Sequence, residues 1–172
     1  LEHLGARELI GRVTAAERTG AAEFLFSHAL VREAAYAMLT DDDRVLGHRL
    51  AGDWLEQTAP GDAMGNPVSD PMTLAEHFRR GEDPGRALRW YQRAADQALK
   101  ANDLAAAIDR AELGFACGAE GELAGALKLT QAEAHVWRGE LAQAERRALE
   151  AAAALSPGSP PWLRAQGHAV IA

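Results

Sequence analysis

Apolar residues recur at intervals of three and four positions from Asp83 to Leu155. This spacing places their side chains on one face of a helix. Four such stripes follow one another, separated by breaks at Asn102-Asp103, at Gly118 to Gly121 and at Gly139. Their members are Leu88, Tyr91, Ala95 and Ala98; Leu104, Ile108, Ala111 and Phe115; Leu123, Leu127, Ala134 and Trp137; and Leu141, Ala144, Ala148, Ala151 and Leu155. The pattern predicts two helical hairpins in series that bury their apolar faces by stacking on one another.

Three helix starts carry the same local signal, a capping residue followed by proline. The pairs are Asp70-Pro71, Asp83-Pro84 and Ser159-Pro160. A side-chain oxygen at the N-cap accepts a free backbone N–H, and proline is tolerated at the first helical position. We therefore expect a helix after each pair, and the first of these helices should end at Gly81.

A β-hairpin is expected near the start of the chain. The short runs Arg12 to Thr14 and Glu23 to Phe26 flank a glycine-containing turn at Arg18 to Gly20. Extended runs on either side of such a turn are typical of two antiparallel strands.

Two helices are expected after this hairpin. The first should run from His28 to Leu39 with Ser27 as its cap. The second should begin at Thr40 to Asp43, where Thr40 at the N-cap and an acid three residues later form a capping box. The second helix carries Val45, Leu46, Leu50, Trp54 and Leu55.

A stretch rich in Gly, Pro, Asn and Asp divides the sequence in two. It covers residues 60–70 and reads as a linker or a long loop. The expected organisation is residues 1–59, then this linker, then helical repeats over 71–172. The chain begins with Leu rather than Met, and its last helical pattern ends without a cap. We therefore expect it to be a piece of a longer protein.

Composition and charge narrow the functional classes. Hydrophobic residues make up 48% of the chain but aromatic residues only 6%, so alanine supplies much of the apolar character, as close-packed helices allow. The 18 basic and 25 acidic residues give a formal charge of −7, which disfavours broad binding to nucleic acid or anionic membranes. A single cysteine, no apolar run near the roughly 20 residues that span a bilayer, and no signal peptide indicate a cytoplasmic protein.

The segment Phe24 to Tyr36 resembles part of the bacterial STAND regulatory ATPases. It contains a phenylalanine-rich strand followed by a His-x-Leu helix with Glu and Tyr, and an Arg-x-x-x-His helix comes next. The later matching residues are Arg44, His48, Arg49, Ala51 and Leu55. In that family this part joins a winged helix to helical repeats. The resemblance implies that Leu1 to Ser27 is the remainder of a winged helix, with Glu23 to Phe26 as its last wing strand.

The later hairpins resemble tetratricopeptide repeats, or the related repeats of the maltose-regulon type of activator. The matching positions are Gly139, Ala144 and Ala151 in one repeat and Tyr91, Ala95, Asn102, Ala107 and Gly114 in the preceding one. Asn102 and Gly139 lie a few residues further apart than the roughly 34 of this repeat, and the loop Ala116 to Gly121 can absorb the difference. Lys128 and His135 depart from the repeat's aromatic and tyrosine positions. Together the resemblances imply a mainly all-α fold: a right-handed, tetratricopeptide-like solenoid with a winged-helix-like β-hairpin near its start.

Little in the sequence points to catalysis, a metal or a cofactor, and none of these is expected. No phosphate-binding loop occurs, so this segment should not bind or hydrolyse ATP. The run Asp41 to Asp43 lacks the spacing of a calcium loop and fits a helix start. The six histidines are scattered without metal-ligand spacing, and Cys117 is best explained as a small buried filler.

A modest basic cluster is the candidate partner-binding site. It comprises Arg86, Arg89, Trp90 and Arg93, with Arg79 and Arg80 nearby in the sequence. Trp90 lies beside the apolar stripe of its helix, which makes it a candidate exposed anchor. The arginines are expected to be salt-bridged surface residues within a partner-binding face.

Three functions remain open. The first is a non-catalytic interaction and regulatory scaffold within a larger signalling ATPase or transcriptional regulator. It would bind a partner protein, upstream domains of the same chain or a small-molecule effector. The second is DNA binding by the winged-helix part. The third is an enzyme of unrecognised type, which would require His48, Asp53 and Glu76 to face one another in a cleft.

Overall fold

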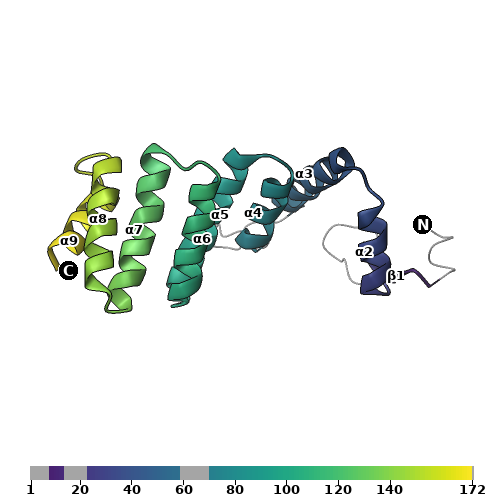
Figure 1. The fold of residues 1–172 in the computed structure, drawn as a ribbon, viewed down its shortest axis with the longest axis horizontal. Helices are drawn as coiled ribbons and strands as arrows, with labels where there is room; N and C mark the ends of the chain where they lie inside the picture. The colour runs from purple at the N-terminus through teal and green to yellow at the C-terminus, as the bar shows by residue number, and fades with distance from the viewer. Residues whose placement is uncertain (1–7, 14–22, 59–69, 172) are drawn as a thin grey trace. The chain divides into compact units, whose positions relative to one another are not determined.

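The computed structural model describes residues 8–13, 23–58 and 70–171. The described chain is mostly helical, with a two-stranded antiparallel sheet near its start, which confirms the predicted fold class (Figure 1). Two compact units, residues 1–47 and 48–172, meet within one helix, and each is described by itself. The predicted linker at 60–70 lies outside the described residues except for Asp70, so that domain boundary stays a prediction.

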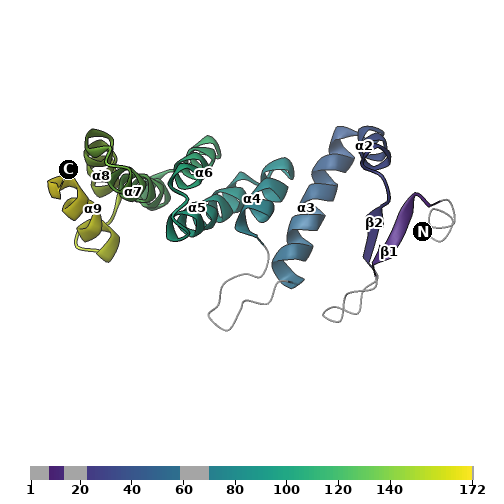
Figure 2. The same cartoon turned by 90° about the horizontal axis from the view of Figure 1, so that it is seen from below.

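The first unit contains the expected β-hairpin. Strand β1 (Ile10–Val13) pairs with β2 (Glu23–Phe26), with Ile10 opposite Phe26 and Gly11 opposite Leu25 (Figure 2). The turn expected at Arg18 to Gly20 lies outside the described residues. Leu25 is 66% exposed.

Helices α2 (Ala29–Ala37) and α3 (Asp41–Thr58) follow this sheet. The prediction that Ser27 caps α2 is wrong: the N-cap is His28, and its side chain makes no capping hydrogen bond. The capping box of α3 is confirmed. The Asp43 backbone N–H donates to Thr40 Oγ1 at 3.1 Å, and the Thr40 hydroxyl donates to the Asp43 carboxylate at 2.7 Å.

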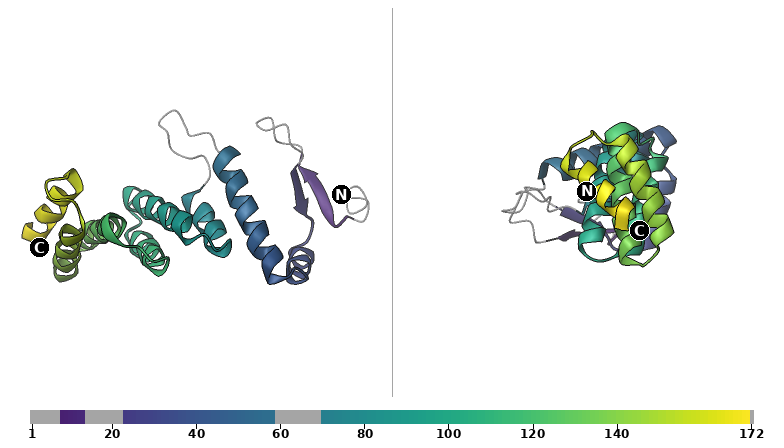
Figure 3. Two further views of the ribbon diagram at one scale, coloured as in Figure 1. Left: turned by 90° about the horizontal axis from the view of Figure 1, so that it is seen from above. Right: turned by 90° about the vertical axis from the view of Figure 1, so that its left-hand side faces the viewer.

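The second unit is a row of antiparallel helices. After the later part of α3 it contains α4 (Pro71–Arg80), α5 (Pro84–Lys100), α6 (Leu104–Ala116), α7 (Gly121–Trp137), α8 (Leu141–Ala154) and α9 (Pro160–Ile171). From α4 onward each helix packs on the next, and α7 also packs on α5 and on α9 (Figure 3). Helices α5, α7 and α9 therefore lie side by side, as the first helices of stacked hairpins do.

The caps predicted at Asp70 and Asp83 are confirmed. Their carboxylates each accept a backbone N–H from the first turn of α4 and α5, and Asp103, which was not predicted as a cap, does the same for α6. Ser159 Oγ accepts the Trp162 N–H at 3.3 Å at the start of α9. These interactions are local, which explains why the sequence alone indicates them.

The same tight turn ends three of the helices. Glu82, Asn102 and Gly139 follow the ends of α4, α5 and α7 with φ of 54°, 60° and 73°. After each turn the next N–H bonds back into the preceding helix; for example, Asp103 N donates to the Ala98 carbonyl at 2.9 Å. This left-handed C-terminal cap accounts for the matching positions of Asn102 and Gly139 in the sequence.

Small residues let the helices approach closely. A Cβ on Gly125 of α7 would lie 2.8 Å from Leu155 Cγ, and a Cβ on Gly114 of α6 would lie 2.7 Å from a Leu127 methyl. Alanines line most of the remaining interface: Ala94, Ala95, Ala107, Ala111, Ala132, Ala134, Ala144, Ala148 and Ala151 are all buried. The alanine-rich composition therefore serves helix packing.

Two members of the predicted apolar stripes are not core residues. Trp137 is 75% exposed and Leu141 is 45% exposed. Both lie beside the turn at Gly139, Trp137 as the last residue of α7 and Leu141 as the first of α8. At a helix end the neighbouring helices no longer cover the stripe, so periodicity alone overestimates burial there.

Candidate interaction groove

Helices α5, α7 and α9 line a hollow on the second unit. Its volume is about 580 Å³. The polar side chains that line it are Gln92, Asp96 and Lys100 from α5, Thr130 and Glu133 from α7, and Arg164 from α9. We call this hollow the α5–α7–α9 groove.

Helical spacing brings these polar groups together. Gln92, Asp96 and Lys100 are four residues apart on α5, so they occupy one face of that helix. The opposite side of α5 carries the buried Trp90 and Ala94. The division of α5 into an apolar and a polar face therefore points a row of polar side chains into the groove.

Asp96 and Thr130 join α5 to α7 inside the groove. The Thr130 hydroxyl donates a 2.8 Å hydrogen bond to Asp96 Oδ1. Burial raises the pKa of Asp96, and the Thr130 hydrogen bond and the charges of Lys100 and Arg164 oppose that rise. The groove thus holds a carboxylate whose hydration is reduced, a group that gains from a further donor or cation.

Glu133 and Arg164 join α7 to α9 across the same groove. Arg164 Nη1 lies 3.2 Å from Glu133 Oε1, and His168 Nε2 lies 3.6 Å from the same oxygen. The Glu133 side chain is 18% exposed, whereas its partner Arg164 is 62% exposed, so solvent reaches this pair from the α9 side. The groove therefore presents both acidic and basic groups, contributed by three helices.

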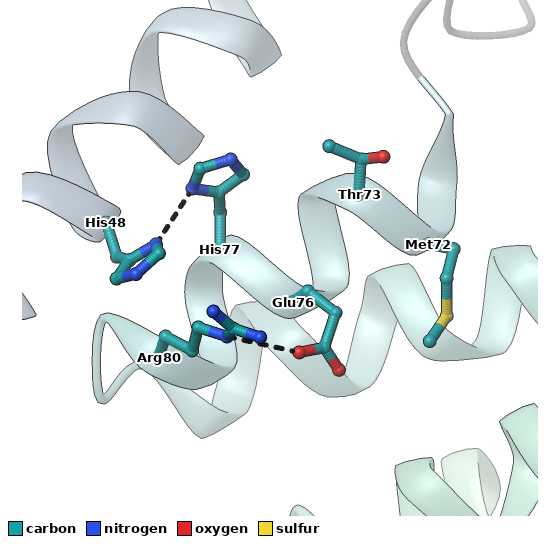
Figure 4. A pocket seen from close by; sticks show the side chains of 6 residues that line it. All are labelled: His48, Met72, Thr73, Glu76, His77 and Arg80. Carbon is teal, nitrogen blue, oxygen red and sulfur yellow. Dashed lines mark hydrogen bonds and ion pairs between the residues drawn. The ribbon is translucent and has the colours of Figure 1, made fainter. Parts of the chain in front are cut away.

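A second, smaller hollow of about 250 Å³ lies between α3 and α4. It is lined by His48, Met72, Thr73, Glu76, His77 and Arg80 (Figure 4). His48 Nδ1 and His77 Nδ1 are 3.2 Å apart. The Glu76 carboxylate pairs with Arg80, with 3.5 Å between Arg80 Nε and Glu76 Oε2, and it is not joined to the histidine pair (Figure 4).

The structure assembles two of the three residues required for the enzyme hypothesis. His48 and Glu76 line one hollow, whereas Asp53 pairs with Arg86. The Glu76 carboxylate accepts hydrogen bonds from Arg79 and from the Tyr91 hydroxyl. The Arg79 hydrogen bond is the main reason that the pKa of Glu76 falls to about 2. Such a carboxylate is a poor proton acceptor near neutral pH.

The predicted exposed anchor, Trp90, is buried. It is 5% exposed, and its Nε1–H donates to Glu56 Oε1 at 3.0 Å. The second half of α3 covers Trp90, and this contact cannot be predicted from the sequence pattern of α5 alone. Arg93 stacks on the Trp90 ring, with its guanidinium carbon 4.5 Å from the ring centroid. Trp90 therefore joins α5 to α3.

Arg86 is salt-bridged, as predicted for the arginine cluster. Its Nε lies 2.7 Å from Asp83 Oδ2, and its Nη1 contacts Asp53 and Glu56 of α3. Its guanidinium carbon lies 4.1 Å from the centroid of the Phe78 ring. Arg86 thus binds α3 to α5, whereas Arg89 and Arg93 are exposed. Partner binding by this set stays a prediction.

The groove residues Asp96, Thr130, Glu133 and Arg164 were missed by sequence reasoning. The row Gln92, Asp96 and Lys100 was readable as a polar face of α5. Its pairing with α7 and α9 depends on tertiary stacking and has no local signature.

Comparison with protein-family models, curated proteins and solved structures finds no match to this chain.

Within the described ranges, no three or more His, Cys, Asp or Glu residues converge as metal ligands. None of the described helices combines the length and the apolar character that crossing a bilayer requires.

Proposed function

We propose that this chain is a non-catalytic interaction scaffold whose α5–α7–α9 groove binds an extended segment of a partner protein. The observation that carries the proposal is the hollow of about 580 Å³ lined by polar side chains from α5, α7 and α9, which are the first helices of three successive hairpins. That volume lies within the range of roughly 300–1,000 Å³ typical of ligand sites.

The character of the groove favours a peptide as its ligand. An extended peptide presents backbone donors and acceptors at regular intervals, and the groove offers both acidic acceptors and basic donors. The partly dehydrated Asp96 carboxylate would accept from a donor on the peptide, and Lys100 would bind an acceptor. Stacked helical hairpins commonly bind partners through such inner faces.

The resemblance of Phe24 to Leu55 to STAND ATPases supports a wider context. We propose that the chain is a regulatory segment of a larger signalling ATPase or transcriptional regulator. In that setting the bound segment can belong to a partner or to another domain of the same polypeptide. A phosphate-binding loop encoded upstream of Leu1 would support this setting, and a coding sequence without one would contradict it.

Selection from a random peptide library tests the groove. Peptides selected on the wild-type chain should bind with dissociation constants in the micromolar range, and Lys100→Glu should weaken them at least tenfold, because it reverses a charge that lines the groove. Arg146→Glu is the matched control, since Arg146 is an exposed residue of α8 outside the groove lining. Peptides that bind the wild type, Lys100→Glu and Arg146→Glu equally would contradict the proposal. So would a library that yields no binder.

A further inference from the structure

The histidine pair between α3 and α4 can hold its hydrogen bond only while one ring is neutral. The two Nδ1 atoms are 3.2 Å apart, and the ring centroids are 5.2 Å apart with the planes inclined by 52° (Figure 4). One nitrogen must donate and the other must accept. A proton on both rings would replace this hydrogen bond with two like charges at contact distance.

The charged groups around the pair oppose a second proton. On α4, the cations Arg79 and Arg80 and the anion Glu76 act on His48. Glu76 is already bound to Arg79, with Oε2 2.8 Å from Nη2, and lies 3.5 Å from Arg80 Nε. The one acidic group of α4 that acts on the pair is therefore largely neutralised by neighbouring arginines.

The charged groups of α3 and α5 close to this contact are engaged elsewhere. Arg49, next to His48, donates to the Gly81 carbonyl with an Nη2–O distance of 2.8 Å. Asp53 pairs with Arg86 of α5, and the Tyr91 hydroxyl of α5 donates to Glu76. The Arg49 hydrogen bond joins the second half of α3 to the end of α4, and the Asp53–Arg86 ion pair joins it to α5.

The two helices also touch closely at a point beyond the histidine pair. A Cβ on Gly52 would lie 2.8 Å from Cε1 of Phe78, and Leu55 packs against the core that contains Phe78 and Trp90. A repulsion introduced at His48 would therefore act beside these contacts, and its relief would separate the second half of α3 from α4.

We propose that His48 and His77 form a proton-operated latch that holds the second half of α3 against α4 when neutral and releases it when both rings are protonated. Burial lowers the pKa of both imidazoles below the ordinary value of 6.5. The released state therefore binds more protons than the latched state once the pH falls below about 6.5. The latch is fully closed above that value and weakens from there down to the lowered pKa values.

Release would expose the surfaces that α3 covers. Trp90 and Arg86 both contact this half of α3. Opening the latch would uncover the Trp90 side chain on α5, together with Arg86. The predicted partner-binding set of Arg86, Arg89, Trp90 and Arg93 would then be accessible in the released state.

Hydrogen exchange on the whole chain tests this latch. After correction for intrinsic rates, a change from pH 7.5 to 5.5 should increase opening of residues 48–57 relative to α7. The increase should be at most about tenfold for each histidine, because pH 5.5 lies one unit below the ordinary pKa of 6.5 that the released rings recover. In His48→Gln/His77→Gln this extra opening should disappear, whereas the exposed control His28→Gln should retain it.

A side-chain NMR titration of the wild-type chain provides a readout that needs no variant. The proposal predicts that both rings titrate below 6.5 and that their protonation is coupled. Two independent titrations at the ordinary value would overturn it. So would a wild-type α3 whose exchange responds to pH no more than that of the double glutamine variant.

Discussion

The Thr130 hydroxyl of α7 donates a 2.8 Å hydrogen bond to the Asp96 carboxylate of α5. These residues belong to different hairpins, so the bond connects successive repeats inside the groove. The same hydroxyl lies 3.2 Å from the Ala126 carbonyl of its own helix. Thr130 thus has an acceptor within α7, and the bond to Asp96 is the one that couples the hairpins.

Replacing Thr130 with valine should destabilise the chain. Thr130→Val removes the donor but keeps the side-chain volume, and it leaves the partly buried Asp96 carboxylate with fewer donors. We expect a loss of about 1–2 kcal/mol at pH 7, measured by urea unfolding. In an Asp96→Asn background the loss should be smaller, because a neutral amide is less costly to leave unpaired. Equal losses in both backgrounds would contradict the assigned bond.

Arg86 should be sensitive even to replacement by lysine. Arg86→Lys keeps the charge but loses the planar group that stacks on Phe78 and reaches both Asp83 and Asp53. We expect the free energy of unfolding to fall by about 1–3 kcal/mol. Arg89→Lys, at an exposed position on the same helix, should change it by less than about 0.5 kcal/mol. Similar effects at both positions would contradict the role of Arg86 in joining α3 to α5.

Two glycine substitutions should have opposite signs. Gly125→Ala places a methyl group 2.8 Å from Leu155 Cγ and 3.3 Å from the Ala151 carbonyl oxygen, so α7 and α8 must separate. We expect a destabilisation of about 1–3 kcal/mol. Gly167→Ala in α9 meets no atom within 4 Å and should stabilise by about 0.5–1 kcal/mol through helix propensity. Thermal unfolding of both variants measures the difference, and a stabilising Gly125→Ala would contradict the close packing of α7 on α8.

Glu76 should contribute to stability in a defined acid range. Its pKa is lowered from 4.5 to about 2 by Arg79, so its contribution is complete above pH 4.5 and is lost as the pH falls toward 2. Glu76→Gln should therefore be less stable than wild type at pH 6, and the gap should narrow between pH 4.5 and 2. Urea unfolding across this range tests the prediction, with Glu145→Gln on the exposed surface of α8 as control. A gap that stays constant with pH would contradict it.

The parts of the fold that depend on neighbouring residues were predictable. Asp70-Pro71 and Asp83-Pro84 mark their helix starts because the capping carboxylate and the backbone N–H that donates to it lie within one turn. The positive φ at Asn102 and Gly139 likewise reflects a local turn that only some residues adopt easily. Stacked helical hairpins follow from such signals combined with the apolar stripes.

The site depends on contacts between elements, which the sequence pattern does not encode. Trp90 was expected to be exposed because it lies beside the stripe of α5, but Glu56 and Leu55 of α3 contact it or its cluster from the other side. The sequence around Asp96 gives no sign that Thr130, 34 positions later, donates a hydrogen bond to it. Predicting either residue requires knowing which helices stack.

Site-specific cross-linking most directly tests whether the groove is the interaction surface. A photoreactive amino acid placed at Gln92, inside the groove, should cross-link a peptide selected on the wild-type chain. The same group at Arg146 on the exposed surface of α8 should not. We expect a cross-link at Gln92 that excess unlabelled peptide abolishes. Cross-linking at Arg146 with none at Gln92 would show that the peptide binds elsewhere and would contradict peptide binding in the α5–α7–α9 groove.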